Sequence, residues 1–359
     1  MRPFIVMSVV LRSYPLRIFN RLAAIWRYLD QMTSQACAKL RKYTVDHIWH
    51  ADWSISATGR WVAKARRTDT GWQIHAIEPV GMLNQFRHGL NHAAKTQSIW
   101  LGLDMPIGFA RYWFDSAGVD SFANLLELMR TPDWQEFFDV CKTAEQISVK
   151  RPFYPAASGV KGSVTRDHLV RGLGLSRFDQ LYRHCERATT DRAAACPSFW
   201  TLGANQVGKA MLHGLKNLII PGYQDGFNIW PFSGDLAACT AKPGVTVIET
   251  YPGEVYGWLG LTSLTKSKQE SRKEAVASVH NIATDHGIEI LPAVFDDIKD
   301  GFAPGQGKDD AFDALIGLMG LIMIAEGKRA ENLPTATAIN TREGWIVGLD
   351  AAKIKDPTK

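Results

Sequence analysis

The order of hydrophobic patterns between residues 45 and 104 constrains the fold more than any other feature of the chain. Residues 45–53 form a short aromatic and β-branched run, and residues 59–67 and 71–80 alternate in polarity on either side of a Thr-Asp-Thr-Gly turn. Short alternating runs with tight connections are typical of consecutive antiparallel strands. The segment therefore predicts a three-stranded meander.

A helix and a different kind of strand follow. In residues 81–96, Met82, Phe86 and Leu90 recur four apart, which predicts one buried helical face. Residues 98–104, SIWLGLD, are nearly all apolar, as expected of a strand that is buried on both faces. The predicted order is β-β-β-α-β, and the fold class is α/β.

The remaining chain predicts a large helical insertion and then a return to the core. The predicted elements are helices over 120–130, 133–147, 165–172, 176–188 and 203–218, a strand over 245–250, a helix over 266–286, a strand over 287–291, a buried helix over 309–326 and a terminal strand over 344–349. We divide the chain into five parts. They are a basic N-terminal extension (1–42), a first part of the core (43–108), the basic insertion (109–242), a second part of the core (243–330) and a tail (331–359).

Composition and charge narrow the class of protein. With 46% apolar and 21% charged residues, the 359-residue chain is neither disordered nor a coiled coil. Residues 1–42 hold eight basic side chains and one acid, and the first 32 residues resemble a transit peptide, an amphipathic surface helix or sequence upstream of a start at Met32. Five cysteines without CxxC spacing, and no apolar run of about 18 residues, predict a cytoplasmic protein without membrane spans.

Acidic residues stand at the ends of three predicted strands. Asp52 closes the first strand, Asp104 the fourth, and Glu249 the strand that follows the insertion. Ligands of open α/β sheets bind beyond the carboxyl ends of the strands, so acids placed there can converge. Each also has a structural interpretation, since aspartates form turns and a buried glutamate can sit in an ion pair.

The apolar helix over 309–326 begins with three more acids. Asp310 and Asp313 are three residues apart and therefore share one side of the first turn, whereas the sequence leaves open whether Asp309 or Asp310 faces the sheet. Acids in a first turn also favour the helix dipole. The succession of three strand acids and a helix acid is explained better by a shared site.

Converging carboxylates repel one another and need a cation, and hard oxygen ligands favour Mg²⁺ or Mn²⁺. Two such ions about 3.5–4 Å apart can hold a phosphodiester and activate water for attack on it. The acids therefore predict phosphodiester hydrolysis at a two-metal site. Residues that we expect to bind the substrate are Lys308, Lys209 and Ser54.

The insertion has the charge expected of a nucleic-acid-binding surface. Residues 142–216 carry twelve basic and five acidic side chains, with aromatic residues interleaved. This pattern is typical of grooves that contact phosphates and stack bases, although it also occurs on solvated helices. The pair His47 and His50 has the wrong strand spacing for a metal site, and Cys196 is expected to be a packing residue.

Five blocks of sequence resemble domain-of-unknown-function family 429, described as predicted nucleases of the ribonuclease H-like fold. The blocks are GLDMPIGFA (102–110), PSFWTLGANQVGKA (197–210), IWPFSG (229–234), IETYPGEVY (248–256) and KDDAFDAL (308–315). The resemblance implies a mixed five-stranded sheet, with three antiparallel and two parallel strands, flanked by helices and interrupted by the insertion. It also implies a divalent-metal nuclease site.

The resemblance assigns roles residue by residue. It implies that Asp52 is the first-strand acid of that fold and Asp104 the fourth-strand acid. Asp310 and Asp313 match its helix acids, and Glu249 belongs to the family's own strand-end block. The chain departs from the common pattern after the first acid. Trp53 and Ser54 follow Asp52, whereas many ribonuclease H-like proteins carry glycine two residues after that acid.

Three functions remain open at this stage. The first is a metal-dependent nuclease in which five acids, Asp52, Asp104, Glu249, Asp310 and Asp313, hold Mg²⁺ or Mn²⁺ and the insertion holds the nucleic acid. The second is an ATPase or phosphotransferase of the related actin-like fold, against which we find no recognisable adenosine loop before the last helix. The third is a non-catalytic module that binds nucleic acid or protein.

Overall fold

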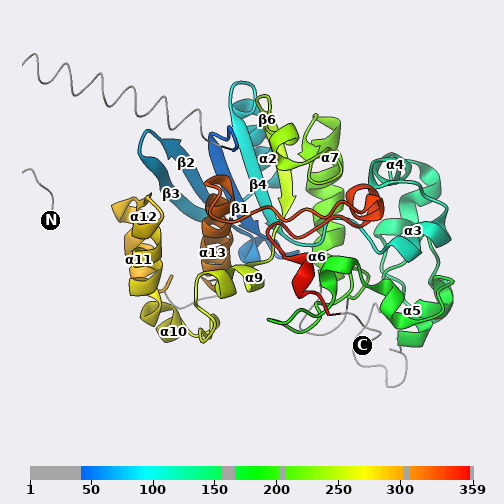
Figure 1. Cartoon of the computed structure of the whole chain (residues 1–359). Helices are drawn as coiled ribbons and strands as arrows, with labels where there is room; N and C mark the ends of the chain where they lie inside the picture. The colour runs from blue at the N-terminus through cyan, green and yellow to red at the C-terminus, as the bar shows by residue number, and fades with distance from the viewer. Residues whose placement is uncertain (1–41, 155–165, 202–206, 303–307, 356–359) are drawn as a thin grey trace, which may run out of the picture. The chain divides into compact units, whose positions relative to one another are not determined.

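A seven-stranded mixed sheet forms the centre of the protein (Figure 1). The computed structural model describes residues 42–154, 166–201, 207–302 and 308–355. The strands, in sheet order, are β5 (Asn228–Ile229), β6 (Gly244–Glu249), β4 (Ser98–Asp104), β1 (His47–Asp52), β2 (Trp61–Thr68), β3 (Gly71–Pro79) and β7 (Ile288–Ile290). The expected extension over residues 1–42 lies, apart from Lys42, outside the described residues.

The pairing of the strands follows their order in the chain. β1, β2 and β3 form an antiparallel meander, while β4 and β6 continue the sheet parallel to β1. Short strands extend both edges, since β5 pairs parallel to β6 and β7 pairs parallel to β3. The α/β class is confirmed, but the sheet has seven strands and not the five expected. β7 corresponds to the predicted strand over 287–291, whereas β5 was not predicted.

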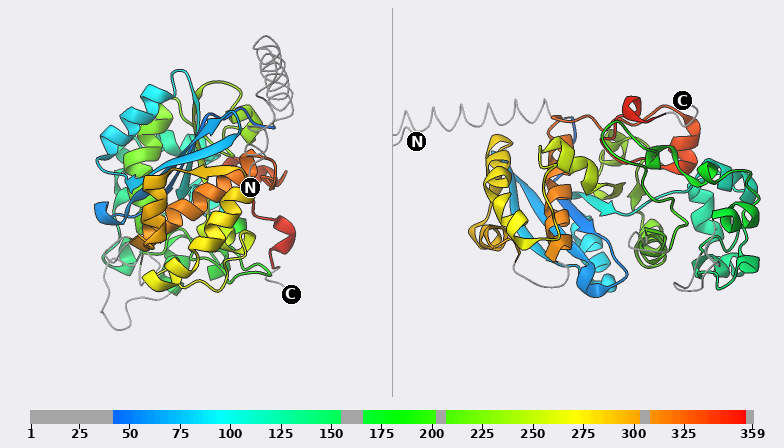
Figure 2. Two further views of the ribbon diagram at one scale, coloured as in Figure 1. Left: turned by 90° about the vertical axis from the view of Figure 1, so that its left-hand side faces the viewer. Right: turned by 90° about the horizontal axis from the view of Figure 1, so that it is seen from below.

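Helix α13 (Lys308–Ala325) covers one face of the sheet and packs on β1 and β2. Beyond Asp313 its side chains are apolar all round, so it has to be covered, and α9 (Pro252–Trp258) packs beside it. His50 of β1 lies fully buried beneath this helix, with Nδ1 3.1 Å from the Ala314 carbonyl oxygen and Nε2 2.7 Å from Thr250 Oγ1. The same apolar cluster includes side chains of α11 (Val276–Asp285) and α12 (Pro292–Lys299). Figure 2 draws these two helices in yellow.

The opposite face is covered by α2 (Leu83–Ala93) and by the insertion. The helices of the insertion are α3 (Arg111–Ala117), α4 (Phe122–Leu128), α5 (Arg166–Gly172), α6 (Val207–Gly214), α7 (Ile220–Gln224) and α8 (Leu236–Cys239). Its centre is a cluster of aromatic rings. The ring of Phe109 stacks on that of Phe199, with 5.0 Å between the ring centres, and meets the Phe137 ring edge-on, with 5.6 Å between the centres. The insertion thus packs around an aromatic core, and that core is continuous with one face of the sheet.

Several predicted helices are shorter or of another type. Residues 133–147 and 176–188 hold 3₁₀ segments in place of α-helices, at Pro132–Phe138, Ala144–Gln146, Phe178–Leu181 and His184–Glu186. The start of the predicted helix over 203–218 lies outside the described residues, and from Val207 the chain runs through α6 and a π-helical turn, Leu215–Ile219, into α7. The predicted helix over 266–286 divides into α10 (Gln269–Glu274) and α11. Met82 was expected on the buried face of α2 but is 61% exposed, because the helix begins after it.

The predicted terminal strand over 344–349 is wrong. Gly344 and Gly348 have φ angles of 72° and 80°, left-handed conformations that interrupt a strand. At Gly344 a side chain would overlap the carbonyl oxygen of Ile107, so the close approach requires glycine. The apolar pattern between the glycines instead reflects burial, since Trp345 and Val347 lie in the core.

Residues Tyr43–Lys359 form one compact unit. Within the described ranges, no helix combines the length and the apolar character that a membrane crossing needs.

Close packing of α13 on β1 predicts a large effect of one methyl group. A Cβ at Gly317 would overlap the buried His50 ring. We expect Gly317→Ala to lower the free energy of unfolding by about 1–3 kcal/mol, because an overpacked core must shift. Gly89→Ala in α2 is the control, since a Cβ there meets nothing within 4 Å, and it should not destabilise the protein. Urea unfolding measures both, and equal stability of the two variants would contradict this packing.

Candidate functional site

Asp52 and Asp104 lie side by side at the carboxyl ends of parallel strands. They are Cα partners in the β1–β4 register. Side chains alternate along a strand, and His50 of β1 and Gly102 of β4 both face α13. Asp52 and Asp104 come two residues after them, and both therefore point to the face that α13 covers.

The first turn of α13 brings two more carboxylates to the same place. Asp310 lines the same cleft as Asp52 and Asp104, and both Asp310 and Asp104 act on the charge of Asp52. Asp313 lies next to them and is 2% exposed. Of the two residues left open by the sequence, Asp310 lines the cleft with Asp52, whereas Asp309 is not among the residues that line it. Four of the five predicted acids thus converge.

Crowding and burial change the protonation of these carboxyl groups. Burial, together with Asp104, Asp313 and Asp310, raises the pKa of Asp52 well above its ordinary value. Burial and the charge of Asp313 raise the pKa of Asp104 to about 7. Burial likewise raises the pKa of Asp310. The cluster therefore keeps protons to a higher pH than an isolated aspartate would, and a nearby cation would favour their release.

Asp313 is held by two donors from outside α13. Lys266 forms an ion pair with its Oδ2, and the Tyr256 hydroxyl donates to its Oδ1 at 2.6 Å. Burial opposes the charge on Lys266, but Asp313, Asp52 and Asp104 raise the pKa of its ammonium group. Lys266 therefore supplies the carboxylate cluster with a permanent positive charge.

The four aspartates line a cleft of about 820 Å³. Ser54, from the loop after β1, and Lys209, from α6, line the same cleft, as expected for substrate contacts. Gly59 closes over it, because a Cβ there would lie 3.2 Å from Asp310 Oδ2. Lys308 does not line it: its ammonium lies 4.5 Å from the centre of the Trp61 ring, at a separate pocket of about 270 Å³.

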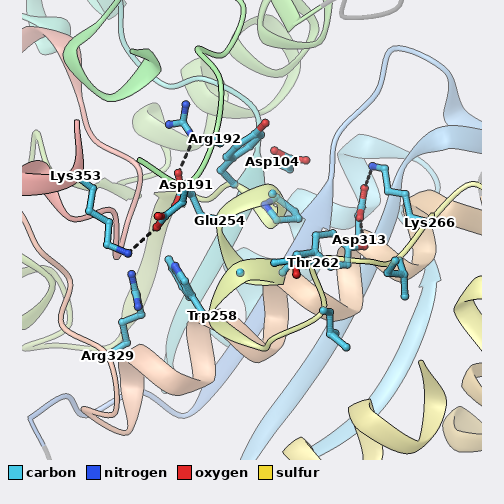
Figure 3. Close-up of a pocket in the computed structure, with 17 residues that line it drawn as sticks. Asp104, Asp191, Arg192, Glu254, Trp258, Thr262, Lys266, Asp313, Arg329 and Lys353 are labelled. Carbon is cyan, nitrogen blue, oxygen red and sulfur yellow. Dashed lines mark hydrogen bonds and ion pairs between the residues drawn. The ribbon is translucent and has the colours of Figure 1, made fainter. Parts of the chain in front are cut away.

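A second pocket of about 730 Å³ adjoins the cleft and shares Asp104, Tyr251, Lys266 and Asp313 with it (Figure 3). Its charged groups are mostly paired. Arg192 Nε lies 2.5 Å from Glu254 Oε1, and Lys353 Nζ lies 2.6 Å from Asp191 Oδ2. Arg329 stacks over Trp258, with its guanidinium carbon 3.9 Å from the ring centre. The two pockets meet at the carboxylates.

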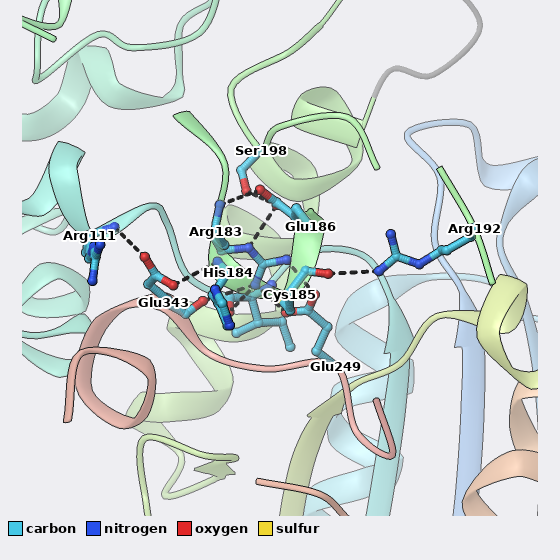
Figure 4. A network of polar contacts seen from close by, with 10 residues as sticks. Arg111, Arg183, His184, Cys185, Glu186, Arg192, Ser198, Glu249 and Glu343 are labelled. Atoms are coloured by element: carbon cyan, nitrogen blue, oxygen red, sulfur yellow. Dashed lines mark hydrogen bonds and ion pairs between the residues drawn. The ribbon is translucent and has the colours of Figure 1, made fainter. Parts of the chain in front are cut away.

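Glu249, the fifth predicted acid, is engaged elsewhere (Figure 4). Its two oxygens accept hydrogen bonds from Arg183 at 2.6 and 2.7 Å, and one of them also accepts from the Ile107 backbone N–H at 2.6 Å. Glu249 and Arg183 are almost fully buried. Glu249 also lines the cleft, but both of its oxygens already have donors, so the structure does not join it to the four aspartates.

The same network ties the insertion and the tail to the core. Arg183 also pairs with Glu186 at 2.8 Å and donates to the carbonyl oxygens of Ile107 and Glu343. Glu343 accepts from the backbone N–H groups of Arg111 and His184. Burial opposes the charge on Arg183, but Cys185, Glu249 and Glu186 raise the pKa of its guanidinium well above the ordinary value. Ile107 comes three residues after Asp104, so the network fixes the loop that leaves the site.

Internal ion pairs also use part of the insertion's positive charge. Arg177 pairs with Asp179, Arg183 with Glu186 and Glu249, and Arg192 with Glu254. Within the described part of the chain, no carboxylate pairs with Lys209, which faces the cleft. The basic surface that the sequence predicts is therefore smaller than its net charge indicates.

Asp52, Asp104 and Asp310 supply the cleft with carboxylate oxygens, the donors that Mg²⁺ and Mn²⁺ prefer. No group of three or more His, Cys, Asp or Glu side chains, among those that the structure describes, could hold a metal ion as it stands. Binding of an ion would therefore need a rearrangement of these side chains.

Sequence reasoning missed the cations of the site. Lys266 lies in an irregular loop and Arg183 in a segment predicted to be an α-helix, and neither belongs to a recognisable motif. The apolar-strand position of Glu249 was a signal for an ion pair, but its partner is 66 residues away. Comparisons of the chain with protein-family models, with curated proteins and with solved structures found no match.

The raised pKa of Asp104 predicts a stability change with pH. The folded protein holds this proton up to about pH 7, whereas the unfolded chain releases it near pH 4, so this contribution to stability is lost as pH rises between those values. Asp104→Asn removes the titration. We expect it to raise the free energy of unfolding at pH 8 by about 1–3 kcal/mol over wild type, and to give no gain at pH 4.

Urea unfolding at the two pH values measures this difference. His50, whose pKa burial lowers to about 3, titrates in both proteins and cancels in the comparison. Asp69→Asn, in the exposed turn between β2 and β3, is the matched control and should follow wild type. An Asp104→Asn protein that is less stable than wild type at pH 8 would contradict the carboxylate crowding.

Removal of the Arg183 guanidinium should be severe. Arg183→Met leaves Glu249 and Glu186 buried without their partner, and we expect a loss of about 3–5 kcal/mol in the free energy of unfolding. The control is Arg177→Met in the same insertion, where the ion pair with Asp179 is exposed and screened by solvent, so its loss should change the stability little. Thermal and urea unfolding compare them; a mild Arg183→Met would show that Glu249 is neutral in the folded protein.

Proposed function

We propose that the protein is a divalent-metal-dependent nuclease built on a ribonuclease H-like core. The observation that carries the proposal is the convergence of Asp52, Asp104, Asp310 and Asp313 from two parallel strands and the first turn of one helix. Carboxylates brought together in a cleft favour binding of hard divalent cations. A structural role explains the cluster poorly, because burying several carboxylates together is costly without a ligand.

The order of the strands supports the fold part of the proposal. β3-β2-β1-β4-β6 is an antiparallel meander continued by two parallel strands, which is the arrangement that the resemblance to family 429 implies. Four of the five resembling blocks contribute to the cleft although they are far apart in sequence. They supply Asp104, Lys209, Tyr251 and Asp310 respectively.

In the proposed reaction Asp52, Asp104 and Asp310 would hold Mg²⁺ or Mn²⁺. The ion supplies an activated water and neutralises charge on the phosphate. The oxygen of water bonds to phosphorus, the P–O ester bond breaks, one proton of the water is delivered to the leaving oxygen and the other is released. Asp52 and Asp104 are placed to orient the water, and Tyr256 keeps Asp313 in position.

The expected substrate is a nucleic acid. Lys209 and Ser54 lie in the cleft where they can contact phosphates on either side of the cleaved bond. The second pocket is lined by the rings of Tyr251 and Trp258, with Arg192 and Arg329 over them, so a base would stack there by displacing a guanidinium group from that ring face. These groups recognise a backbone and a ring, which every nucleic acid has, so the substrate panel must include DNA and RNA.

Cleavage assays test the proposal. Labelled single-stranded, duplex, hybrid and branched nucleic acids are incubated with the full chain and Mg²⁺ or Mn²⁺. We expect cleavage of at least one substrate and a loss of about 100-fold or more in Asp52→Asn and Asp310→Asn, because loss of a metal ligand removes several kcal/mol of transition-state stabilisation. Asp309→Asn, on the same helical turn but away from the cleft lining, should retain activity.

The alternatives give different results in the same experiment. Tight binding of nucleic acid without cleavage would identify a non-catalytic binding module, a function consistent with the ion pair that already occupies Asp313. Hydrolysis of ATP without nucleic-acid cleavage would identify the ATPase or phosphotransferase. Cleavage that persists in both aspartate variants would exclude the aspartates as the catalytic site.

A further inference from the structure

The ammonium group of Lys266 lies within the proposed metal site. Its Nζ is ion-paired with Oδ2 of Asp313, and the charges of Asp52 and Asp104 act on it as well. It lines both the cleft and the adjoining pocket, where Figure 3 shows its ion pair with Asp313. A positive charge therefore already occupies one side of the carboxylate cluster.

The loop that carries Lys266 is fixed by a buried arginine. Arg272 is 3% exposed and donates from Nη1 to the Lys266 carbonyl oxygen at 2.5 Å. Its Nε donates to the carbonyl oxygen of Gly301 at 2.9 Å, which ties the loop to the segment after α12. The backbone of Lys266 is thus held in place, while the side chain, 48% exposed, keeps room to move its terminal group.

Asp313 offers little capacity for a metal ion. It is 2% exposed, Lys266 occupies Oδ2, and the hydroxyl of Tyr256 occupies Oδ1 at 2.6 Å. A second divalent ion would need this carboxylate as a ligand and would have to displace the ammonium group. Asp52, Asp104 and Asp310 line the same cleft, and none of them forms an ion pair with a cation among the described residues.

Resting on the proposed nuclease function, we propose that the site takes one divalent ion, at Asp52, Asp104 and Asp310, and that the Lys266 ammonium stands in the place of a second. A lysine ammonium is a compact, hydrated point charge on a flexible stem. It can therefore pair with Asp313 in the free protein and contact a phosphate oxygen of a bound phosphodiester. The substrate thus meets one metal ion and one organic cation, in contrast to the two ions that the sequence predicts.

Counting bound Mn²⁺ tests this proposal without reference to activity. The full chain is titrated with Mn²⁺, and free ion is measured by electron paramagnetic resonance. We expect one Mn²⁺ per chain in wild type and in Lys266→Arg, which keeps the charge, and two in Lys266→Met, which keeps the stem and frees Asp313. Lys209→Met, which removes another ammonium from the same cleft, is the matched control and should bind one.

A double variant protects the test against a change in folding. Lys266→Met with Asp313→Asn removes the ion pair without leaving a buried unpaired carboxylate, and it should bind one Mn²⁺ because the carboxylate that would hold the second is gone. Two ions in this double variant would place the extra ion away from Asp313 and overturn the proposal.

The remaining outcomes separate the two proposals. Two Mn²⁺ in wild type would overturn the role of Lys266 and leave the metal-dependent nuclease in place. One Mn²⁺ in wild type and one of equal affinity in Lys266→Met would also overturn it, because the ammonium would then not occupy an ion position. No bound Mn²⁺ in any variant would overturn the proposed metal-dependent function, and the role of Lys266 with it.

Discussion

The packing of α13 across β1 and β2 is the constraint on which the site depends. Beyond Asp313 this helix is apolar on every side, so the sheet and α9 must cover it, and His50 fixes its position through contacts with Ala314 and Gly317. Its N-terminus then lies at the carboxyl ends of β1 and β4, where the strand acids are. The positive end of the helix dipole helps to hold the carboxylates there, but it does not neutralise them.

The protein therefore holds a cluster of like charges in its folded state. Lys266 offsets part of the repulsion, and the Tyr256 hydroxyl satisfies an oxygen that burial would otherwise leave without a donor. This offset is incomplete at neutral pH, as the raised pKa of Asp104 indicates. Crowded acids at strand ends thus lower stability, and in the proposed function the same crowding would favour binding of a cation, an opposition expected at functional sites.

Much of this arrangement could be predicted from hydrophobic periodicity and from the tendency of ligands to bind beyond the carboxyl ends of strands. The order of the first four strands, the buried helix α13 and the meeting of Asp52, Asp104, Asp310 and Asp313 follow from alternation, apolar runs and the placement of ligands beyond strand ends. The partners of Glu249 and Asp313 could not be predicted, since Arg183 and Lys266 lie in irregular stretches of segments expected to be helical, and their positions depend on tertiary packing. Lys308 stands beside the acids in sequence, but the helix turns its side chain toward Trp61.

The Arg183 network positions the insertion relative to the carboxylate cleft, although it contributes none of the four aspartates of that cleft. A buried ion pair adds little net stability compared with apolar packing, because desolvation offsets its attraction. It does, however, accept only a narrow range of geometries. Arg183 has to reach Glu249 at the end of β6, the Ile107 carbonyl after Asp104 and the Glu343 carbonyl of the tail at once. The network thereby fixes how the insertion, the tail and the strand ends meet, and it keeps Glu249 paired with Arg183 and apart from the aspartates that it neighbours.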